Sequence, residues 1–449
     1  MQRDILAKYD RLVPRYTSYP TAPQFNEGVD GALYTDWLRN LSTDIPLSVY
    51  VHIPFCDTMC WFCGCNTKIT NRYDPIEAYL DTLMQEIDLI AGILGPKRIA
   101  NHIHWGGGSP TILKPEHLLK LANKLRENFE LSPGAEFAVE IDPRGLEDSA
   151  LGALAEGGIT RASIGVQDVN PIVQKAVNRV QPVEITRHVI DTVRSLGITG
   201  INVDLMYGLP HQTVKGVERN VDTILEMEPD RLALFGYAHV PWMKSHMKKI
   251  NKDVLPGRDE RHDQMLAAAE RLKANGYRWI GLDHFAKDTD SLSTTLEAGK
   301  LNRNFQGYTV DPCEALVGLG ASSIGAHPNG YIQNHTPVRD WRRCIEDGVA
   351  PTAKGLTLTD DDRLRRAIIE RLMCDLHVDV EVMCKRFDRA PQDFLDSFET
   401  LKPLQDDGLC AIDGWKVTIP EDARILMRTV AAPFDKYLAP DAKRHSRAV

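Results

Sequence analysis

The chain of 449 residues has 53 lysines and arginines against 62 aspartates and glutamates, which gives a net charge of −9. This acidic balance argues against general binding of nucleic acid or of anionic membranes. With 43% hydrophobic and 26% charged residues, the composition is that of a globular enzyme. The length suits two or three domains, or one barrel of roughly 250–300 residues beside a smaller unit.

The amino-terminal stretch MQRDILAKYDRLVPRY lacks the apolar core of a signal peptide. The longest charge-free run, 315–338, is too polar to cross a bilayer. We therefore expect a cytoplasmic protein. In a reducing compartment, clustered cysteines indicate metal or redox chemistry more often than structural disulfides.

Six short β-rich runs follow one another along the first half of the chain, and helical patterns such as 75–94 and 184–197 lie between them. The runs are LSVYVHIPF (47–55), NHIHW (101–105), EFAVEIDP (136–143), RASIGVQD (161–168), GINVDLMYGLP (200–210) and RLALFGYAHVP (231–241). This alternation predicts a parallel α/β fold, either barrel-like or doubly wound. No G-x-G-x-x-G follows the first run, and Glu140, Gln167 and Asp204 lie at the carboxyl ends of their runs. We therefore expect a barrel with its site at those ends.

The pattern loosens after residue 242. The stretch YRWIGLDHFA (277–286) indicates one more strand, and RNFQGYTVDP (303–312) indicates a loop. From about residue 355 the sequence is charged and helix-rich, and LCAIDGWKVTI (409–419) indicates a small β hairpin. These features predict a carboxyl-terminal domain of winged-helix type.

Four of the nine cysteines lie within ten residues, CDTMCWFCGC (56–65), directly after the first predicted strand. Disulfides, zinc, an iron–sulfur cluster and thiol redox chemistry are the candidates. A structural zinc site usually takes two ligand pairs, and the sequence has no second C-x2-C or H-x3-H pair. A thioredoxin-like C-x-x-C needs only two cysteines. Three thiolates in one loop can hold three corners of an iron–sulfur cube and leave one iron open to a small ligand.

The spacing C-x3-C-x2-C of Cys56, Cys60 and Cys63, with Phe62 before the third cysteine, resembles the signature of the radical S-adenosylmethionine (SAM) superfamily. The resemblance implies that these thiolates bind a [4Fe–4S] cluster and that SAM chelates its open iron. An electron from the cluster then splits SAM into methionine and a 5′-deoxyadenosyl radical. Cys65, two residues after Cys63, could be a fourth ligand, a nearby functional thiol or a filler, and the resemblance implies that only the first three cysteines are ligands.

The stretch HWGGGSPT (104–111) is similar to the superfamily's GGE-type motif, with serine where an acid is common. Consecutive glycines let the backbone approach a ligand closely, and exposed N–H groups could meet a carboxylate.

A closer resemblance runs from about residue 10 to near the carboxyl end. The motifs PRYTSYPTA, YVHIPFC, CGCN, HWGGG, EIDPR, GVQD, NVDLMYGLP, YAHVP, DHFA and RNFQGYT occur in this order. Together they resemble the oxygen-independent coproporphyrinogen III dehydrogenases of haem biosynthesis. This resemblance implies an incomplete (β/α)6 barrel at 46–350 with an amino-terminal segment, 1–45, over its mouth. It also implies a small helical, winged-helix-like domain with a β hairpin at 351–449.

Two SAM molecules bind in that family. Carried over by motif, the cluster-bound SAM would contact Tyr50, Phe62, Gly107, Glu140 and Ile324. The second SAM would contact Gly108, Ser109, Gln167, Arg179, Asp204 and Ala238. Ser109 replaces a more usual threonine and keeps the hydroxyl, and the thiol of Cys65 is expected to act in catalysis.

The implied reaction converts two propionates of coproporphyrinogen III to vinyl groups and gives protoporphyrinogen IX. The radical removes a hydrogen atom from the propionate β-carbon, CO2 leaves, and one electron passes to an acceptor. No side chain has a pKa suited to taking a proton from such a C–H bond, so a cofactor has to act. Four substrate carboxylates require cations near the barrel mouth. Arg15 and Arg303 are the candidates, with surface salt bridges as the alternative role for both.

The expected partners are the porphyrinogen and an electron donor such as a flavodoxin or ferredoxin, and we expect a monomer. Two other functions stay open. A related branch of haem chaperones keeps the three cysteines and SAM binding, but generally lacks the CGC, RYTSYP and RNFQGYT segments. A metal-binding regulator would use the carboxyl-terminal unit to bind DNA, and the acidic stretch 391–408 argues against it.

Overall fold

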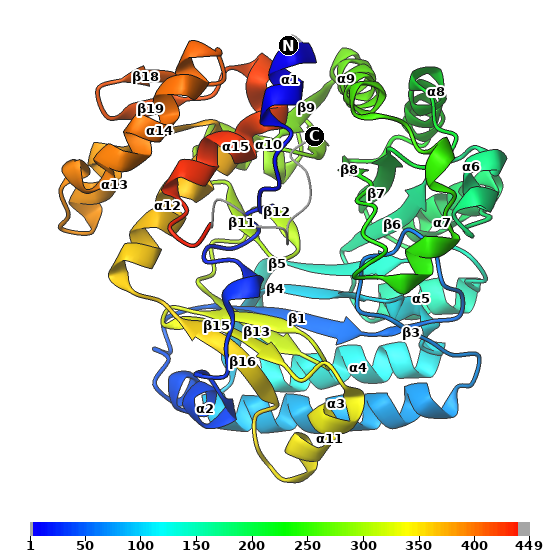
Figure 1. The fold of residues 1–449 in the computed structure, drawn as a ribbon. Coiled ribbons are helices and arrows are strands. Elements are labelled where there is room, and N and C mark those ends of the chain that lie inside the picture. The colour runs from blue at the N-terminus through cyan, green and yellow to red at the C-terminus, as the bar shows by residue number, and fades with distance from the viewer. Residues whose placement is uncertain (1–2, 439–449) are drawn as a thin grey trace.

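The computed structural model describes residues 3–438. Its main feature is a curved 12-stranded sheet with the order β16-β15-β14-β13-β1-β4-β5-β6-β7-β8-β10-β9 (Figure 1). Strands β16 and β9 form its two edges, so the sheet is an open barrel, as predicted. The six predicted runs form its parallel centre: β1 (Leu47–Ile53), β4 (Arg98–Gly107), β5 (Phe129–Ile141), β6 (Arg161–Gln167), β7 (Gly200–Tyr207) and β8 (Arg231–Gly236).

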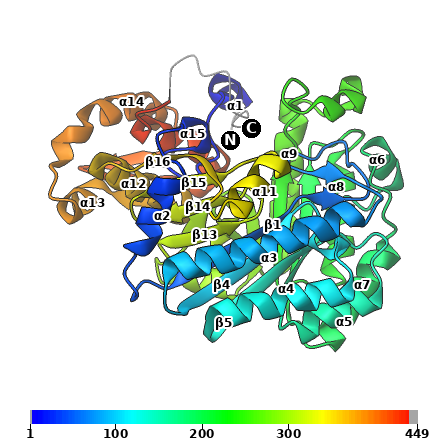
Figure 2. The ribbon, with the colours of Figure 1, turned by 90° about the horizontal axis from the view of Figure 1, so that it is seen from below.

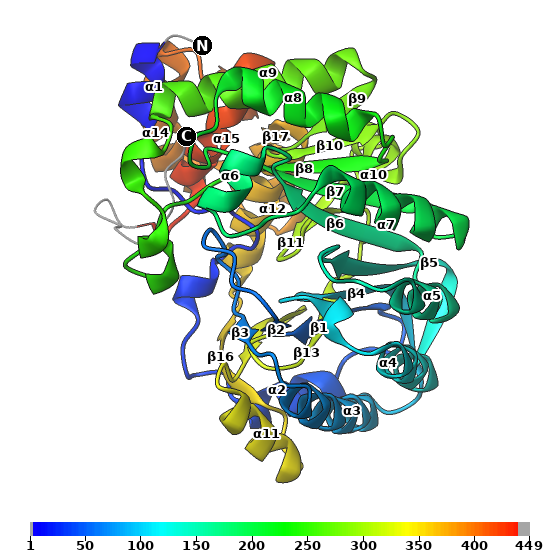
Figure 3. The same ribbon diagram turned by 90° about the vertical axis from the view of Figure 1, so that its right-hand side faces the viewer.

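Helices follow these strands and cover the convex face of the sheet (Figures 2 and 3). They are α3 (Asp74–Leu94), α4 (Pro115–Asn128), α5 (Asp148–Glu156), α6 (Pro171–Ala176), α7 (Val183–Ser195), α8 (Val214–Leu225) and α9 (Arg258–Ala274). The main hydrophobic core lies between them and the sheet. Helices α2 (Gly31–Arg39) and α11 (Val338–Glu346) add Trp37 and Trp341 to this core.

Alternation along the strands determines which side chains face the barrel interior. In β6, Ala162, Ile164 and Val166 are buried, and the residues between them are only partly buried. Strand β7 repeats this pattern with buried residues at 201, 203 and 205. Because successive side chains point to opposite faces, the polar residues of both strands form inward rows. The sequence therefore builds an apolar outer layer and a polar interior from the same strands.

Four strands of the sheet were not predicted: β13 (Ala315–Leu319), β14 (Ile324–His327), β15 (Gly330–Asn334) and β16 (Thr352–Thr357). They are short, and glycines and three prolines interrupt the sequence between them, so no alternation of useful length appears. β13 pairs with β1 in parallel, and β14 to β16 continue as antiparallel strands.

The prediction of one strand over 277–286 was wrong. The chain forms the antiparallel strands β9 (Tyr277–Ile280) and β10 (His284–Lys287), which extend the sheet beyond β8. Gly281 makes the turn with φ +53°, and a Cβ there would lie 1.9 Å from the ring of Tyr308. The predicted loop 303–312 likewise contains a small hairpin, β11 (Asn302–Asn304) and β12 (Gly307–Thr309). Helix α10 (Ser291–Glu297) precedes it.

The carboxyl-terminal part contains α12 (Asp360–Asp375), α13 (Val380–Arg386), α14 (Leu395–Asp406) and α15 (Met427–Ala431). A three-stranded sheet, β17 (His377–Asp379), β19 (Lys416–Thr418) and β18 (Ala411–Asp413), lies beside them. The predicted hairpin is β18 with β19. This part shares a second hydrophobic core with α1 (Arg3–Tyr9) and the following chain, which contribute Leu6, Tyr9, Val13, Tyr16 and Tyr19 (Figure 1).

Two short strands, β2 (Phe55–Cys56) and β3 (Lys68–Ile69), pair in parallel and hold the two ends of the cysteine loop together. Within residues 3–438, no helix is long and apolar enough to cross a membrane.

Candidate active site

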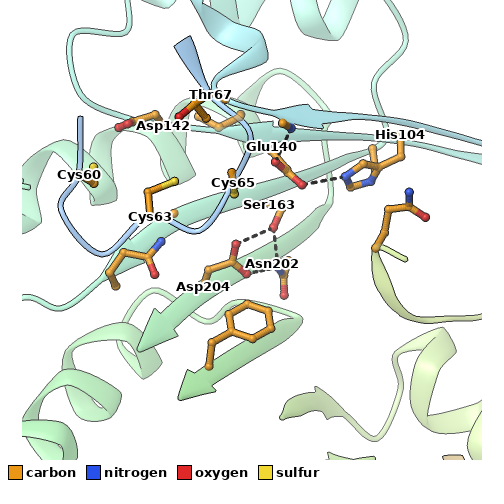
Figure 4. A pocket seen from close by; sticks show the side chains of 18 of the residues that line it. Cys60, Cys63, Cys65, Thr67, His104, Glu140, Asp142, Ser163, Asn202 and Asp204 are labelled. Atoms are coloured by element: carbon orange, nitrogen blue, oxygen red, sulfur yellow. Dashed lines mark hydrogen bonds and ion pairs between the residues drawn. The ribbon is translucent and has the colours of Figure 1, made fainter. Parts of the chain in front are cut away.

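A cavity of about 380 Å³ opens at the carboxyl ends of the central strands, and the cysteine loop after β1 forms one wall of it (Figure 4). Cys60, Cys63 and Cys65 lie on this loop, and the polar side chains of β5, β6 and β7 face them. Most of the predicted residues line this cavity: Cys56, Cys60, Phe62, Cys63, Cys65, Gly107, Gly108, Glu140, Gln167, Arg179 and Asp204. The convergence of Gln167, Arg179 and Asp204, which spacing alone could not establish, is thus a finding of the structure.

The cysteine loop is held from several sides. Asn178 Nδ2 donates to the Met59 carbonyl at 2.8 Å, and Trp61 N donates to the Val177 carbonyl at 2.9 Å. On the other flank, His246 Nε2 lies 2.8 Å from the Cys63 carbonyl and Lys244 Nζ lies 2.9 Å from the Cys65 carbonyl. All nine cysteines fall within the described residues and are free thiols. The four thiols of the cysteine loop are therefore not tied up in disulfides.

Two arginines lie beside the first buried thiol. Arg144 Nη2 and Arg179 Nη1 are 3.3 Å and 3.5 Å from Cys60 Sγ. Both guanidinium groups also pair with Asp142, at 2.6 Å and 3.1 Å. The two guanidinium groups therefore lie within hydrogen-bonding reach of Cys60 Sγ, and the Asp142 carboxylate holds both of them there.

The three glycines after β4 each meet a different neighbour. A Cβ at Gly106 would lie 2.7 Å from Glu140 Oε1, and one at Gly108 would lie 2.4 Å from the Phe55 carbonyl oxygen. Gly107 has φ +115°, and a Cβ there would lie 2.6 Å from the His52 ring. Close packing of β4 against β1 and β5 therefore requires glycine.

Two N–H groups of this glycine run already have partners within the chain. Gly107 N donates to a carboxylate, as expected, but it is that of Glu140, whose Oε2 lies at 3.1 Å. Gly108 N donates to the Ile53 carbonyl at 2.8 Å, and the next amide, that of Ser109, donates to the Phe55 carbonyl at 2.8 Å. Pairing with the backbone of Ile53 and Phe55 uses these last two donors, and the sequence gives no sign of it.

Glu140 is the carboxylate closest to the glycine turn. Its Oε1 accepts from His104 Nε2 at 3.2 Å (Figure 4). Burial alone would raise the pKa of Glu140, but the hydrogen bonds from His104 and Gly107 outweigh burial and lower that pKa. The group is therefore held as an anion at the cavity wall.

Asp204 lies deeper, on the inward row of β7. Asn202 Nδ2 donates to Asp204 Oδ1 at 3.0 Å, and Ser163 Oγ lies 3.5 Å from Oδ2 (Figure 4). Burial and the nearby Glu140 carboxylate raise the pKa of Asp204 to about 6. Both of these hydrogen bonds come from neutral groups, so a cationic ligand would complement this carboxylate.

Several predicted residues lie outside the cavity lining. The Tyr50 hydroxyl is 3.0 Å from His52 Nδ1, and the Tyr50 ring stacks on His104 with 5.8 Å between ring centroids. Tyr50 therefore packs against the histidine that donates to Glu140. Ser109 is buried, with its hydroxyl 3.0 Å from that of Thr111. Ile324 is the first residue of β14.

Ala238 and Arg15 line a second cavity at the ends of β7 and β8. Arg303 lines a third cavity, where its Nε donates to the Tyr16 carbonyl at 3.1 Å. The structure therefore does not bring the two candidate substrate arginines into the cavity of the cysteines.

The site also contains functional candidates that sequence reasoning missed. His104, Arg144, Ser163 and Asn202 all line the cavity. The signal that could have found Ser163 and Asn202 is strand alternation, since Asn202 stands two residues from Asp204 and Ser163 stands four residues from Gln167.

Three comparisons with known proteins agree with this picture. Residues 50–224 match the radical SAM superfamily, and residues 358–426 match the HemN C-terminal domain. The oxygen-independent coproporphyrinogen III oxidase of Bradyrhizobium diazoefficiens is 48% identical over 100% of both chains. That of Pseudomonas aeruginosa is 39% identical, over 99% of this chain and 98% of the relative.

Among solved structures, the coproporphyrinogen III oxidase HemN from Escherichia coli, described as a radical SAM enzyme, superposes with a TM-score of 0.91. It is 37% identical, and the match covers 94% of this chain and 98% of the other. The chain belongs to the family of oxygen-independent coproporphyrinogen III oxidases, within the radical SAM superfamily.

Proposed function

We propose that the chain is the radical SAM oxidoreductase that converts two propionates of coproporphyrinogen III to vinyl groups, giving protoporphyrinogen IX in oxygen-independent haem biosynthesis. The observation that carries the proposal is the meeting of three cysteines with Glu140, Arg179 and Asp204 around one cavity, in a chain that matches such oxidases along its whole length. The enzyme is proposed to act in the cytoplasm.

The family implies a [4Fe–4S] cluster and SAM, and the residues present suit both. Cys56, Cys60 and Cys63 would hold the cluster, and Arg144 and Arg179 lie beside the Cys60 thiol. When bound and reduced, the cluster and SAM supply a carbon-centred radical that removes a hydrogen atom from the propionate β-carbon. The propionate then loses CO2 and one electron.

The chain's own groups would bind and orient these ligands. Tyr50, Phe62, Gly107, Glu140 and Ile324 are proposed to surround the cluster-bound SAM. Glu140 is an anion there and would attract the amino group of SAM. The glycine turn leaves no side chain between this carboxylate and the cavity.

A second SAM is proposed at Gly108, Ser109, Gln167, Arg179, Asp204 and Ala238. Arg179 supplies a cation for the SAM carboxylate and Asp204 an anion for its amino or sulfonium group. Ala238 lies in the neighbouring cavity, so this SAM would extend from one cavity toward the other. Cys65 lines the active cavity on the cysteine loop and is proposed to act on the substrate in turnover.

An electron donor such as a flavodoxin or ferredoxin is proposed to reduce the cluster. A surface beside the cysteine loop supports this. Between residues 242 and 252 the chain carries four lysines and no acidic residue. Trp242 and Met243 are 70% and 65% exposed. Contacts of Lys244 and His246 tie this segment to the cysteine loop. A basic, partly apolar surface next to the cluster suits brief contact with an acidic carrier. The enzyme is proposed to be a monomer.

The proposal is tested by anaerobic incubation of the reconstituted protein with reductant, SAM and coproporphyrinogen III. The expected products are protoporphyrinogen IX and about two 5′-deoxyadenosines per tetrapyrrole, one for each decarboxylation. Deoxyadenosine without a vinyl product would overturn the proposed substrate. Neither product from protein with a complete cluster, together with tight haem binding, would favour the alternative of a haem chaperone.

A further inference from the structure

A second cavity, of about 410 Å³, lies next to the active cavity. It is formed by the ends of β7 and β8, the start of α9, the chain at 10–15 and residues 425 and 428. Four arginines line it, Arg15, Arg258, Arg261 and Arg428, against the two carboxylates Asp10 and Asp283. Segments distant in the sequence thus contribute guanidinium groups to one enclosed space.

Arg258 pairs with Asp259 at 2.9 Å, whereas the hydrogen bonds of Arg15 and Arg261 leave their positive charge in place. Arg15 Nη2 donates to the Gly236 carbonyl at 3.2 Å, and Arg261 Nη1 donates to the Tyr237 carbonyl at 2.7 Å. Carbonyl oxygens satisfy N–H groups but bring no negative charge. The Nε of Arg261 is buried and has no hydrogen-bond partner among the described residues. A buried guanidinium donor in this state is a ready partner for an incoming carboxylate.

The remaining electrostatics agree with an anion site. Burial, together with the neighbouring cations Arg15 and Arg303, lowers the pKa of Arg428 to about 10. Burial would raise the pKa of Asp283, but His284 and then Arg303 and Arg15 outweigh it and lower that pKa. The fold therefore holds several cations close together at the cost of mutual repulsion, which a bound anion relieves.

The two cavities adjoin at two places in the chain. Phe235 lines the active cavity and its neighbour Gly236 lines the second one. His284 lines the active cavity, and its Nδ1 is 2.8 Å from the Asp283 carboxylate, which lines the second. The two cavities therefore border each other at the end of β8 and at the start of β10.

We propose that this second cavity is a carboxylate site, in which Arg15 and Arg261 bind propionate side chains of the tetrapyrrole while another propionate reacts in the active cavity. This inference rests on the proposed function. Coproporphyrinogen carries four propionates, so every reacting side chain leaves others that need cationic partners. Guanidinium groups bind carboxylates in bidentate fashion, which would fix the orientation of the ring.

The test measures binding of coproporphyrin III, the stable oxidised tetracarboxylate, to the cluster-loaded protein by porphyrin fluorescence under anaerobic conditions. Arg15→Gln and Arg261→Gln should each weaken binding about tenfold or more. Arg15→Lys keeps the charge and should recover most of the affinity. Arg339→Gln, at a side chain that is 88% exposed, is the matched control and should bind like the unsubstituted protein.

Two further readouts separate a binding role from misfolding and from loss of the proposed function. Substrate-free cleavage of SAM and the melting temperature are measured for every variant, and the control Arg339→Gln should match the unsubstituted protein in both. The tetramethyl ester of coproporphyrin, which has no carboxylates, should bind equally to all variants. The proposal is overturned if Arg15→Gln and Arg261→Gln bind coproporphyrin as tightly as Arg339→Gln, or if the ester loses affinity to the same degree as the acid. Failure of the unsubstituted protein to form vinyl product would instead overturn the proposed function.

Discussion

The environment of Asp204 indicates the charge of the ligand that this site binds. Its pKa of about 6 lies above the ordinary value of 3.8 because of burial. Folding therefore favours the neutral acid, and the stability that this group contributes below pH 3.8 is lost as the pH rises through about 6. A cationic ligand beside Asp204 favours the carboxylate and removes that conflict.

SAM binding should therefore weaken as the pH falls from about 7.5 to about 5, because Asp204 takes up a proton in this window. Asp204→Asn should weaken SAM binding at the higher pH by about tenfold and flatten the pH dependence. It should also raise the melting temperature of the SAM-free protein at that pH. The stability gain has a ceiling of about 3 kcal/mol, from a pKa shift of roughly two units. Anaerobic titration calorimetry at both pH values measures the affinity, and an unchanged slope in Asp204→Asn would contradict this role.

Position 107 requires glycine for two reasons, its backbone conformation and the close approach of His52. Gly107→Ala would combine a positive φ with a Cβ 2.6 Å from the His52 ring, so His52 and the Tyr50–His104 stack behind Glu140 must shift. Gly95→Ala is the matched control, since Gly95 also has positive φ, +84°, and nothing lies within 4 Å of its Cβ position. Gly95→Ala should cost about 1–2 kcal/mol of backbone strain and leave SAM cleavage intact.

Gly107→Ala should destabilise the protein by more than Gly95→Ala and abolish SAM cleavage. Melting temperature and deoxyadenosine yield measure the two effects. Equal behaviour of the two variants would show that the close approach at Gly107 has no part in the site.

At the scale of elements, the segment 242–252 and the cysteine loop contact each other and form one surface. Lys248→Glu with Lys249→Glu reverses two exposed charges on it, and Lys97→Glu with Lys416→Glu makes the same change in net charge elsewhere. The first pair should slow turnover roughly tenfold when a flavodoxin or ferredoxin supplies electrons, and the loss should shrink at high salt. With dithionite as reductant, which needs no docking surface, both pairs should match the unsubstituted protein. An equal loss with both reductants would exclude a docking role.

Elements of the parallel centre were predictable because their signals are local. Each of β1 and β4 to β8 has a β-rich run followed by a helix, and the inward polar rows of β6 and β7 follow from alternation alone. Strands β13 to β16 were not predictable, because their hydrogen bonds come from distant segments and their own runs are short. The hairpin of β9 and β10 depends on Gly281. This position requires glycine because a Cβ there would collide with the ring of Tyr308, which is distant in the sequence.

The candidate site residues were likewise predictable only where their signal is local in the sequence. The three cysteines and Glu140 follow motifs and meet in one cavity. Arg144 and His104 were missed because their importance lies in contacts with Cys60 and Glu140, which no local pattern records. Arg15 was selected from its motif, and the structure places it among other arginines of the second cavity, which sequence spacing could not group.

At the scale of the whole molecule, the amino-terminal segment, the large sheet and the carboxyl-terminal part together line the second cavity. The amino-terminal residues 6–19 pack into the core of the carboxyl-terminal part, so the two ends of the chain form one unit (Figure 1). Strand β16 belongs to the large sheet, and the HemN C-terminal match starts at residue 358. We propose that the carboxyl-terminal domain begins after β16 rather than at residue 351. The second cavity, with its four arginines, lies between this unit and the sheet, so a tetrapyrrole bound there would contact both.

The central claim is that this enclosed space directs hydrogen removal to the β-carbon of a propionate. The most direct measurement uses coproporphyrinogen III with deuterium at the propionate β-carbons, and follows the 5′-deoxyadenosine formed during turnover by mass spectrometry. We expect one deuterium in each deoxyadenosine and one deoxyadenosine for each vinyl group formed. Vinyl product with unlabelled deoxyadenosine, or labelled deoxyadenosine without loss of CO2, would contradict the account.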